Sequence, residues 1–296
     1  MIDFRHITFL HLCKIKNYTK TAKELHLTQP TVTQHIQYLE ELYGTKLFEY
    51  TGKALNLTEK GRQLYEYTLK MVADSKKIRE IIMSNEKIQS ITFGATLTIG
   101  EFIMPSILSR IMQERKDLHF NMLVENTQTL LEKLQNGEIS FALLEGFFDK
   151  SRYSYQTFRK EEFIGVCSAE SEFKGGEFQL EDLLKSKLIL RERGSGTREI
   201  LEHILYEKNL SIESFENVVE IGSINSIKKL VARNQGITFM YKVAAEKELA
   251  SGSLYQINIA DFQYTREFNF VHLKNSIFED RYLEWFNLLK TASPFS

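Results

Sequence analysis

Residues 17–44 read NYTKTAKELHLTQPTVTQHIQYLEELYG, and this stretch decides the fold of the first part of the chain. Asn17 is suited to capping a helix whose inward face carries Ala22 and Leu25 at helical spacing. The stretch is therefore expected to begin with a short amphipathic helix.

A second helix is expected after a very short connector. His26 and Leu27 form that connector, and Thr28 caps a helix that carries Pro30 in its first turn. A missing N–H costs nothing there, because it would have no partner within the helix. The pattern predicts two short helices joined by a tight turn.

The predicted second helix has two different faces. Val32, Ile36 and Leu39 recur at helical spacing and must face a core. The opposite face ends in uncharged hydrogen-bonding groups, which are those of Gln29, Thr31, Thr33, Gln34 and Gln37. Such groups suit the base edges and phosphates of DNA. An ordinary helical hairpin with a solvated face is the alternative, but such a face usually carries Lys and Glu, and Thr is a poor helix former.

A two-stranded wing is predicted directly after this helix. Residues 46–61 read KLFEYTGKALNLTEKG, in which two short apolar runs flank Thr51-Gly52-Lys53. Short apolar runs on either side of such a turn are typical of a hairpin. Thr58-Glu59 then opens the next helix.

Residues 1 to about 90 resemble the winged helix-turn-helix of the LysR-type transcriptional regulators. The resemblance rests on the order and spacing of Phe4, Phe9, Ala22, Leu25, the run LTQP at 27–30, Ile36, Leu39-Glu40, Leu42, Gly44, Leu47-Phe48-Glu49, Thr51 and the run LTEKG at 57–61. It implies that the chain binds double-stranded operator DNA. The residues that would do so are Thr28, Gln29, Pro30, Thr31, Thr33, Gln34, Gln37, Lys46 and Lys53.

The chain also departs from the family pattern. Relatives usually carry Ala-Ala in place of Thr21-Ala22, Ser in place of Thr33, and basic residues near Gln34 and Tyr50. The two missing positive charges remove phosphate contacts, which supply most nonspecific affinity for DNA. We therefore expect weak nonspecific binding, with the DNA backbone held by Lys46, Lys53, Lys60 and Arg62.

Composition agrees with a folded protein of several domains. The chain has 296 residues, 43% hydrophobic and 26% charged, which is enough for two or three sizeable cores. The formal net charge is −1, but basic residues outnumber acidic ones in residues 1–90 and the reverse holds in 91–296. A basic head on an acidic body fits DNA binding at one end only.

Several classes of protein are not expected from the sequence. We find no signal-peptide pattern at the start and no run long enough to span a membrane, so we expect a cytoplasmic protein. Cys13 and Cys167 would lie in different domains and belong to no metal-spaced cluster, so neither a disulfide nor a metal site is predicted. No cofactor is expected.

The segment from Thr58 to about Lys87 predicts a long linker helix, because after Gly61 it contains neither Pro nor Gly. Apolar residues repeat every seven positions along it, and the predicted dimerisation residues are Leu64, Met71 and Ile78. The stripe could instead pack on its own winged domain. A helix that reaches beyond that small domain would expose the stripe, which favours a homodimer, assembling in turn to a tetramer.

The rest of the chain alternates strand-like and helix-like segments, as in an α/β sheet with mostly parallel strands. The expected strands cover 91–95, 118–124, 141–144, 163–167, 187–190, 218–221, 237–240 and 268–273, and the expected helices 100–115, 127–136, 197–208, 226–233 and 278–290. This organisation resembles the effector domain of the same family, which is similar to periplasmic binding proteins.

The resemblance implies a multidomain architecture: an α-rich winged helix-turn-helix, a long linker helix and a two-lobe α/β effector domain. The predicted domains are 1–60 for DNA binding, 58–87 for the linker and dimerisation helix, 88–161 plus 267–296 for lobe I, and 162–266 for lobe II. A ligand cleft is expected between the lobes.

The sharpest site signal in the body is the turn Arg191-Glu-Arg-Gly-Ser-Gly-Thr-Arg198 between a strand and a helix. Its glycines allow tight turns, its hydroxyls donate hydrogen bonds, and the following helix directs N–H groups at it. These features predict a small anion site. The alternative is a capped turn without a ligand, since Gly, Ser and Thr are common at helix starts; the family resemblance favours an anionic metabolite.

Three further segments stand just before predicted helices: Thr96-Leu-Thr98, Asn126-Thr127 and Gly222-Ser223. Each alone could be a helix cap, but together they surround a crevice of the kind where open α/β sheets bind ligands. The predicted effector-binding residues are Thr96, Thr98, Asn126, Thr127, Ser195, Gly196, Thr197, Arg198 and Ser223.

Other functions are weighed against a regulator. An enzyme is not predicted, since HExxH, GxSxG, P-loop and CxxC motifs are lacking and the seven His are scattered. A solute-binding protein would need a signal peptide. A small-anion sensor that acts through a protein partner rather than DNA is the remaining alternative, and the predicted recognition helix argues against it.

Overall fold

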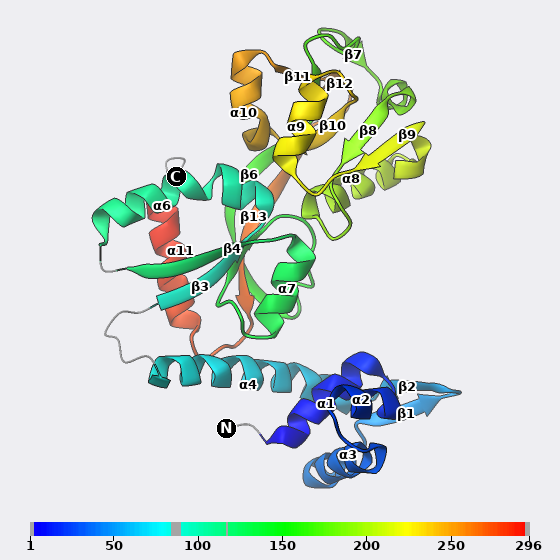
Figure 1. Cartoon of the computed structure of the whole chain (residues 1–296), viewed down its shortest axis with the longest axis vertical. Helices are drawn as coiled ribbons and strands as arrows, with labels where there is room; N and C mark the ends of the chain where they lie inside the picture. The colour runs from blue at the N-terminus through cyan, green and yellow to red at the C-terminus, as the bar shows by residue number, and fades with distance from the viewer. Residues whose placement is uncertain (1–2, 84–89, 117, 294–296) are drawn as a thin grey trace. The chain divides into compact units, whose positions relative to one another are not determined.

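The computed structural model describes residues 3–83, 90–116 and 118–293. Contacts divide the chain into two compact units. We call the first the head, which is residues 1–86 with 135–138 and 275–278, and the remainder the body. Figure 1 shows the helices and strands of both units.

The head holds a helix-turn-helix followed by a wing and a long helix. Its elements are α1 Phe4–Ile15, α2 Tyr18–Glu24, α3 Gln29–Tyr43, β1 Phe48–Thr51, β2 Ala54–Leu57 and α4 Glu59–Met83. The side chain of Asn17 accepts a hydrogen bond from the Lys20 N–H, and that of Thr28 accepts one from the Thr31 N–H. The predicted caps are therefore confirmed.

The turn between α2 and α3 is closed by the backbone. His26 adopts a left-handed conformation with φ 54°, and the Leu27 N–H donates to the Ala22 carbonyl. Leu25 was predicted within the first of these helices, but it follows α2 as the C-cap residue and is only half-buried. The sharp turn ends the helix one residue earlier than apolar spacing suggests.

The core of the head joins α1, α3 and the wing. Its buried members are Phe9, Leu12, Cys13, Ile36, Leu39, Leu47, Phe48 and Leu55. The wing strands pair antiparallel with Phe48 opposite Leu57, and Gly52 at φ 64° forms the turn. Only one face of α3 enters this core, so its polar face stays outside.

The long helix α4 is anchored at its start. Thr58 donates to the Lys46 carbonyl at 2.7 Å and accepts from the Gly61 N–H at 2.9 Å. The predicted helix from Thr58 to about Lys87 is found as α4 up to Met83, and its last residues lie outside the described chain. Leu64 packs against the head core, whereas Met71 and Ile78 are exposed.

The body is a two-lobe α/β structure whose described residues form one seven-stranded sheet and two two-stranded sheets. Its elements in lobe I are β3 Ser90–Ala95, α5 Leu97–Phe102, α6 Met104–Glu114, β4 His119–Val124, α7 Thr127–Gln135, β5 Ala142–Leu144 and α11 Glu279–Ala292. Those in lobe II are β7 Glu177–Phe178, η1 Leu180–Lys185, β8 Lys187–Leu190, α8 Gly196–Glu207, η2 Ile212–Ser214, β9 Asn217–Glu220, α9 Ile224–Ala232, β10 Thr238–Tyr241, α10 Lys242–Ser251, β11 Leu254–Gln256 and β12 Asn258–Ile259.

Two long strands join the lobes. β6 Tyr153–Ser168 and β13 Tyr264–Leu273 pair antiparallel along the whole of β13, and Figure 1 shows them passing from one lobe to the other. Within the described residues the sheet order is β10-β6-β13-β5-β3-β4, with β11 on β6. β3 pairs parallel with β4 and β5, so the carboxyl ends of these strands meet at one edge.

Each lobe has its own apolar core. Stacked rings of Phe93, Phe141 and Phe270 with Trp285 fill lobe I between the sheet and α11. Lobe II is centred on an aliphatic cluster: Ile164, Val166, Ile189, Ile224, Ile227, Val231, Met240, Ala244, Ala245 and Leu254. Leu97 and Phe102 of α5 pack against that second cluster, so α5 bridges the lobes.

The helix predicted at 100–115 is wrong in one respect, because two helices occupy this segment. α5 ends at Phe102 and α6 starts at Met104, with Pro105 in its first turn. Proline lacks the N–H that a continuous helix would need there. The sequence pattern also missed α10. No helix of the described residues is both long and apolar enough to cross a membrane.

Replacing Gly61 by alanine should loosen the head. The added methyl would collide with the Leu47 carbonyl oxygen and lie 3.0 Å from a Leu57 methyl. Overpacking costs roughly 1–3 kcal/mol, which outweighs the gain of up to about 1 kcal/mol in helix propensity. Hydrogen exchange of the wing and α3 amides should quicken, while Trp285 fluorescence, which reports the body, should not change.

The matched control is Gln63→Ala, an exposed position on the same turn of α4. It should leave exchange in the wing unaltered. Equal hydrogen-exchange protection in Gly61→Ala and wild type would show that the contact between α4 and the wing accommodates the methyl without a loss of stability.

Candidate functional site

The exposed face of α3 is ordered by its own hydrogen bonds. Gln34 and Gln37 are exposed, while the Gln29 side chain donates to the Thr33 hydroxyl at 2.9 Å. The hydroxyls of Thr28 and Thr31 lie 2.7 Å apart, and Pro30 is also exposed. The predicted DNA-binding residues of α3 therefore lie together at its start and along its solvent side.

The two lysines predicted to contact DNA, Lys46 and Lys53, have different surroundings. The Lys46 ammonium lies 2.6 Å from the Glu40 carboxylate, and its hydrogen bond to that carboxylate raises the pKa of Lys46. The same carboxylate also accepts a hydrogen bond from the Leu47 N–H. A phosphate would have to compete with that carboxylate. Lys53 is exposed on the turn of the wing, and no ion pair of its ammonium is found within the described residues.

In the body, the strand β8 runs into a Gly-rich turn and then α8. Gly194 has φ 85°, and α8 begins at Gly196 with Ser195 as its N-cap residue. The Ser195 side chain makes no capping hydrogen bond, although it is 1% exposed. The first N–H groups of α8 are therefore left for another acceptor.

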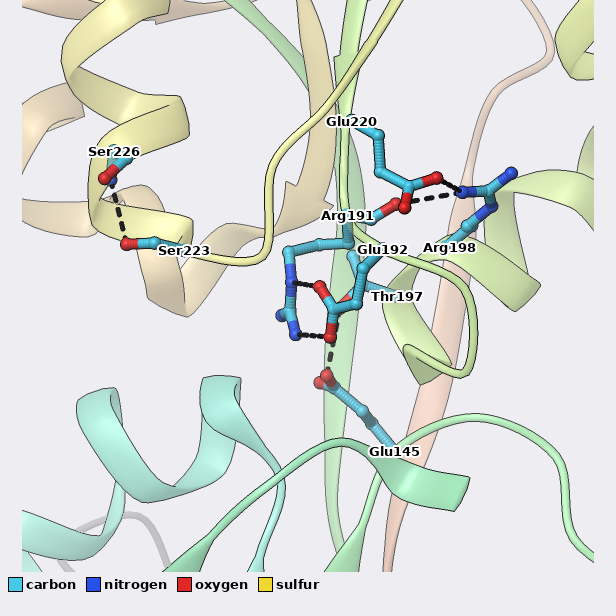
Figure 2. Close-up of polar contacts among 8 residues, drawn as sticks. All are labelled: Glu145, Arg191, Glu192, Thr197, Arg198, Glu220, Ser223 and Ser226. Atoms are coloured by element: carbon cyan, nitrogen blue, oxygen red, sulfur yellow. Dashed lines mark hydrogen bonds and ion pairs between the residues drawn. The ribbon is translucent and has the colours of Figure 1, made fainter. Parts of the chain in front are cut away.

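The loop after β5 packs directly on this turn. The Thr197 hydroxyl donates to the Glu145 carboxyl at 2.9 Å, and the Thr127 hydroxyl donates to the Glu145 carbonyl at 2.8 Å. A methyl on Gly146 would lie 2.6 Å from the Cα of Gly196, so both positions need glycine. Figure 2 shows the Glu145 side chain rising from its loop toward the end of β8. This junction joins lobe I to lobe II.

Glu145 is an unusual carboxyl. Burial raises its pKa to about 7, and the hydroxyls of Thr98 and Thr197 and the charge of Arg191 only partly oppose that rise. Tyr241 lies at the end of β10. Burial is the main cause that raises its pKa, and the charge of Glu145 raises it further. The carboxyl therefore takes up or releases a proton near neutral pH.

Arg191 is held by its neighbour in sequence. Its Nε and Nη2 atoms donate to the two oxygens of Glu192, each at 2.8 Å (Figure 2). Its Nη1 atom is buried, and no group of the described chain accepts a hydrogen bond from it. Five more buried atoms of this region lack a partner among the described residues: Thr96 Oγ1, Glu145 Oε2, Ser195 Oγ, Glu199 Oε2 and Tyr241 OH.

The structure brings together most of the predicted effector residues but not all. Thr98, Thr127 and Thr197 surround Glu145, and Gly196 lies against its loop. Asn126 caps α7 through the Thr129 N–H and contacts Glu192. Thr96 and Ser195 are buried in the flanking turns.

Two predicted effector residues have other partners. Arg198 is turned to Glu202 and Glu220, and it donates to the Arg191 carbonyl at 3.3 Å. Ser223 is exposed and caps α9 through the Ser226 N–H (Figure 2). Any effector contact by either residue stays a prediction.

The sequence pattern missed three residues of this junction: Glu145, Arg191 as a donor, and Tyr241. A signal for the first was present, because Glu145-Gly146 follows the buried run at 141–144 directly. A charged residue at the carboxyl end of a buried strand is a common place for a site residue. Tyr241 offered no such signal, since an aromatic residue that ends a buried strand is usually core.

Comparison with known proteins identifies both parts of the chain. Residues 84–293 match the family model of the LysR substrate binding domain, and residues 6–62 match that of the bacterial regulatory helix-turn-helix protein, lysR family. The HTH-type transcriptional regulator CysL of Bacillus subtilis is 26% identical over 268 residues, covering 90% of this chain and 89% of CysL.

Solved structures show the same fold. The Corynebacterium glutamicum OxyR C206 mutant is similar with a TM-score of 0.60 and 21% identity, covering 97% of this chain and 90% of OxyR. The Synechocystis CcmR regulatory domain, in complex with 2-PG, has a TM-score of 0.60 and 20% identity, covering 69% of this chain and 97% of that domain.

Ionisation of Glu145 should make the body less stable as pH rises. Its pKa is about 7 when folded and near 4.5 when exposed, so the folded state binds the extra proton between these values and stability falls across that window. Glu145→Gln, which cannot ionise, should be more stable than wild type at about pH 8, by on the order of 1–3 kcal/mol, and no more stable near pH 4.5. Urea unfolding followed by Trp285 fluorescence measures this difference.

The control is Glu170→Gln, an exposed carboxyl elsewhere in the body, which should follow wild type at both pH values. A Glu145→Gln advantage that did not grow with pH would contradict a buried, ionising carboxyl.

Proposed function

The chain belongs to the LysR-type family of transcriptional regulators, and from this premise we propose that it binds a specific operator and responds to a small oxyanion held between its lobes. The observation that carries the DNA-binding part is the polar face of α3, which lies outside the head core with Gln34 and Gln37 exposed. Thr31, Thr33, Gln34 and Gln37 would set sequence preference through base edges. Lys46 and Lys53 would hold phosphates.

The effector part of the proposal rests on the junction around Glu145. Thr96, Thr98, Thr127, Ser195, Gly196 and Thr197 would form the effector site, with Asn126 beside them. Support comes from the buried donors that lack partners there and from the open N-terminus of α8. The CcmR regulatory domain, which shares this fold, was solved in complex with 2-PG. Its complex supports a small ligand in a domain of this fold.

Effector binding would act through the strands that join the lobes. β6 and β13 pass between lobe I and lobe II as a paired ribbon, and α5 contacts the core of lobe II. A ligand that binds one lobe arrangement better than another shifts the population toward it. In a dimer or tetramer, that shift would alter the spacing of recognition helices and the bending of DNA.

We propose that α4 forms the dimer contact. Tyr67, Met71, Ile78, Ile81 and Ile82 are exposed on one side of the helix. An apolar stripe of this size rarely stays in water. Leu64, the third predicted dimerisation residue, packs against the core of its own head. The domain limits are proposed as 1–60, 58–87, 88–161 plus 267–296, and 162–266.

The alternative, an anion sensor that acts through a protein partner, is not favoured. Residues 6–62 match a DNA-binding family model, and the uncharged face of α3 has no evident purpose in such a sensor. Specific operator binding decides between the two functions.

Gln34 and Lys53 should affect DNA binding differently. The operator is first selected from genomic fragments with the full-length protein. Gln34→Ala should weaken operator binding by roughly 1–3 kcal/mol and leave nonspecific binding unchanged. Lys53→Ala should weaken both and lower the slope of log K against log salt by about 1. Fluorescence anisotropy at several salt concentrations measures both effects.

Glu24→Ala, an exposed change on α2, serves as the control for the surface of the head. If no genomic fragment were enriched, the proposed function would be lost. Equal losses of specific and nonspecific affinity in Gln34→Ala would remove only the assigned role of that residue.

A charge within the α4 stripe should separate the dimer. Ile78→Glu places a carboxylate where an apolar contact is expected, so burial would desolvate it at a cost of several kcal/mol. Sedimentation equilibrium should show a monomer at protein concentrations where wild type is a dimer. Lys76→Glu, exposed on the same helix, should remain dimeric. A monomeric wild type at micromolar concentration would contradict the dimer.

A further inference from the structure

Several buried polar groups at the lobe junction have no partner among the described residues and are able to donate: the Arg191 Nη1 atom, which can only donate, and the hydroxyls of Thr96, Ser195 and Tyr241, which can donate or accept. The Ser195 side chain also makes no capping hydrogen bond to the first N–H groups of α8. A buried polar group without a partner is destabilising, so a cluster of such groups usually has a ligand or water to satisfy it. A ligand here would be rich in acceptor oxygens.

Glu145 does not fit this set, because an ionised carboxylate only accepts. Its Oε1 atom accepts from the Thr197 hydroxyl, while its Oε2 atom is buried without a partner. Arg191 cannot neutralise it fully, since that guanidinium is shared with Glu192 through two hydrogen bonds. The site thus presents two carboxyl oxygens without partners, Glu145 Oε2 and Glu199 Oε2, beside several groups of the described chain that can donate.

The ionisable groups that face Glu145 come from three elements. Arg191 and Glu192 follow β8, Tyr241 ends β10, and Glu199 lies on α8 close to Gly146. Arg191 favours the ionised carboxylate and Glu192 opposes it. Glu199, whose pKa is itself raised by burial, adds no positive charge. The surroundings of Glu145 therefore provide no cation dedicated to it.

An oxyanion and a carboxylate cannot face each other without a proton between them. We propose that Glu145 and the effector share one proton, so that the site selects small oxyanions that carry a titratable O–H group over fully ionised oxyanions of the same shape. The inference rests on the proposed effector site and names its ligand class. In this arrangement the ligand O–H donates to Oε2, no covalent bond forms or breaks, and every other ligand oxygen accepts from the donors around it.

Inorganic phosphate and sulfate test this selection, because they are tetrahedral dianions of nearly one shape. Phosphate keeps one O–H at mildly alkaline pH, so it can bind the ionised carboxylate without exchanging a proton with water. Sulfate has none, so Glu145 must first take a proton from solvent. Its affinity must then fall tenfold for each unit of pH above the pKa of that carboxyl, which is about 7.

A structural water is the competing explanation of the unpartnered atoms. Water would satisfy the same donors and also donate to Glu145 Oε2. It would not, however, make the site distinguish one oxyanion from another. The difference between the two ions is therefore the decisive quantity.

Isothermal titration calorimetry measures the affinity of the full-length protein for each ion between about pH 7.5 and 9. Repeating the titrations in two buffers of different ionisation heat gives the number of protons taken up on binding. For wild type we expect phosphate to bind at least about tenfold more tightly than sulfate at about pH 8.5. Sulfate should take up one proton and phosphate none. Glu145→Gln should make sulfate binding independent of pH and bring the two affinities within about threefold, since an amide both donates and accepts.

Two variants serve as controls. Thr197→Val, which removes a hydroxyl of the junction, should weaken both ions by a similar factor. Glu170→Gln should bind as wild type does. If Glu145→Gln failed to fold, judged by Trp285 fluorescence, the proton counts of wild type would still decide.

Three results would overturn the inference: neither ion binding wild type, sulfate binding as tightly as phosphate without proton uptake, or an unchanged preference in folded Glu145→Gln. Operator selection with the same preparation separates this failure from failure of the proposed function. Selected DNA without oxyanion binding would remove only the ligand class.

Discussion

The body depends on one close contact, the seating of the Glu145-Gly146 loop on the start of α8. Residues 52 positions apart in sequence meet there, with the Thr197 hydroxyl bonded to the Glu145 carboxyl. Gly146 and Gly196 are needed because a methyl on either would collide with the opposite backbone. The contact holds the ends of β5 and β8 together, so it fixes the distance between the lobes at the point where the buried polar groups gather.

The electrostatics of this junction follow from burial. Arginines that look like anion ligands in the sequence are largely used within lobe II, Arg191 by Glu192 and Arg198 by Glu202 and Glu220. These pairs leave hydroxyls, backbone N–H groups and one guanidinium nitrogen as the donors of the site. Because the Glu145 and Glu199 carboxyls beside them are buried, the pKa values of both are raised. The polar groups of the junction therefore offer hydrogen bonds rather than a net positive charge.

The fold of the head depends instead on local hydrogen bonds at the starts of its helices. Side-chain caps at Asn17, Thr28 and Thr58 start three successive helices and satisfy N–H groups that would otherwise lack partners. The caps fix where each helix begins, and the apolar stripe of α3 then fixes which face turns inward. The polar face is left outside as a consequence. Lys46 shows the limit of this local control, since its ion pair with Glu40 depends on the wing folding back toward α3.

The sequence by itself determined the elements whose signals are local: the helix-turn-helix, the wing, the long helix, most strands of the body and the Gly-rich turn. Capping residues and apolar spacing act within a few positions of the chain, so the helices and strands that they specify can be predicted without a structure. Tertiary structure alone decided that Pro105 splits a helix in two, that Leu64 faces its own head, and that Arg198 and Ser223 have partners away from the junction. It also decided that Glu145 is buried. The burial of that carboxyl arises only when β5, β8 and β10 come together, and no pattern along the chain encodes a distance between strands so far apart.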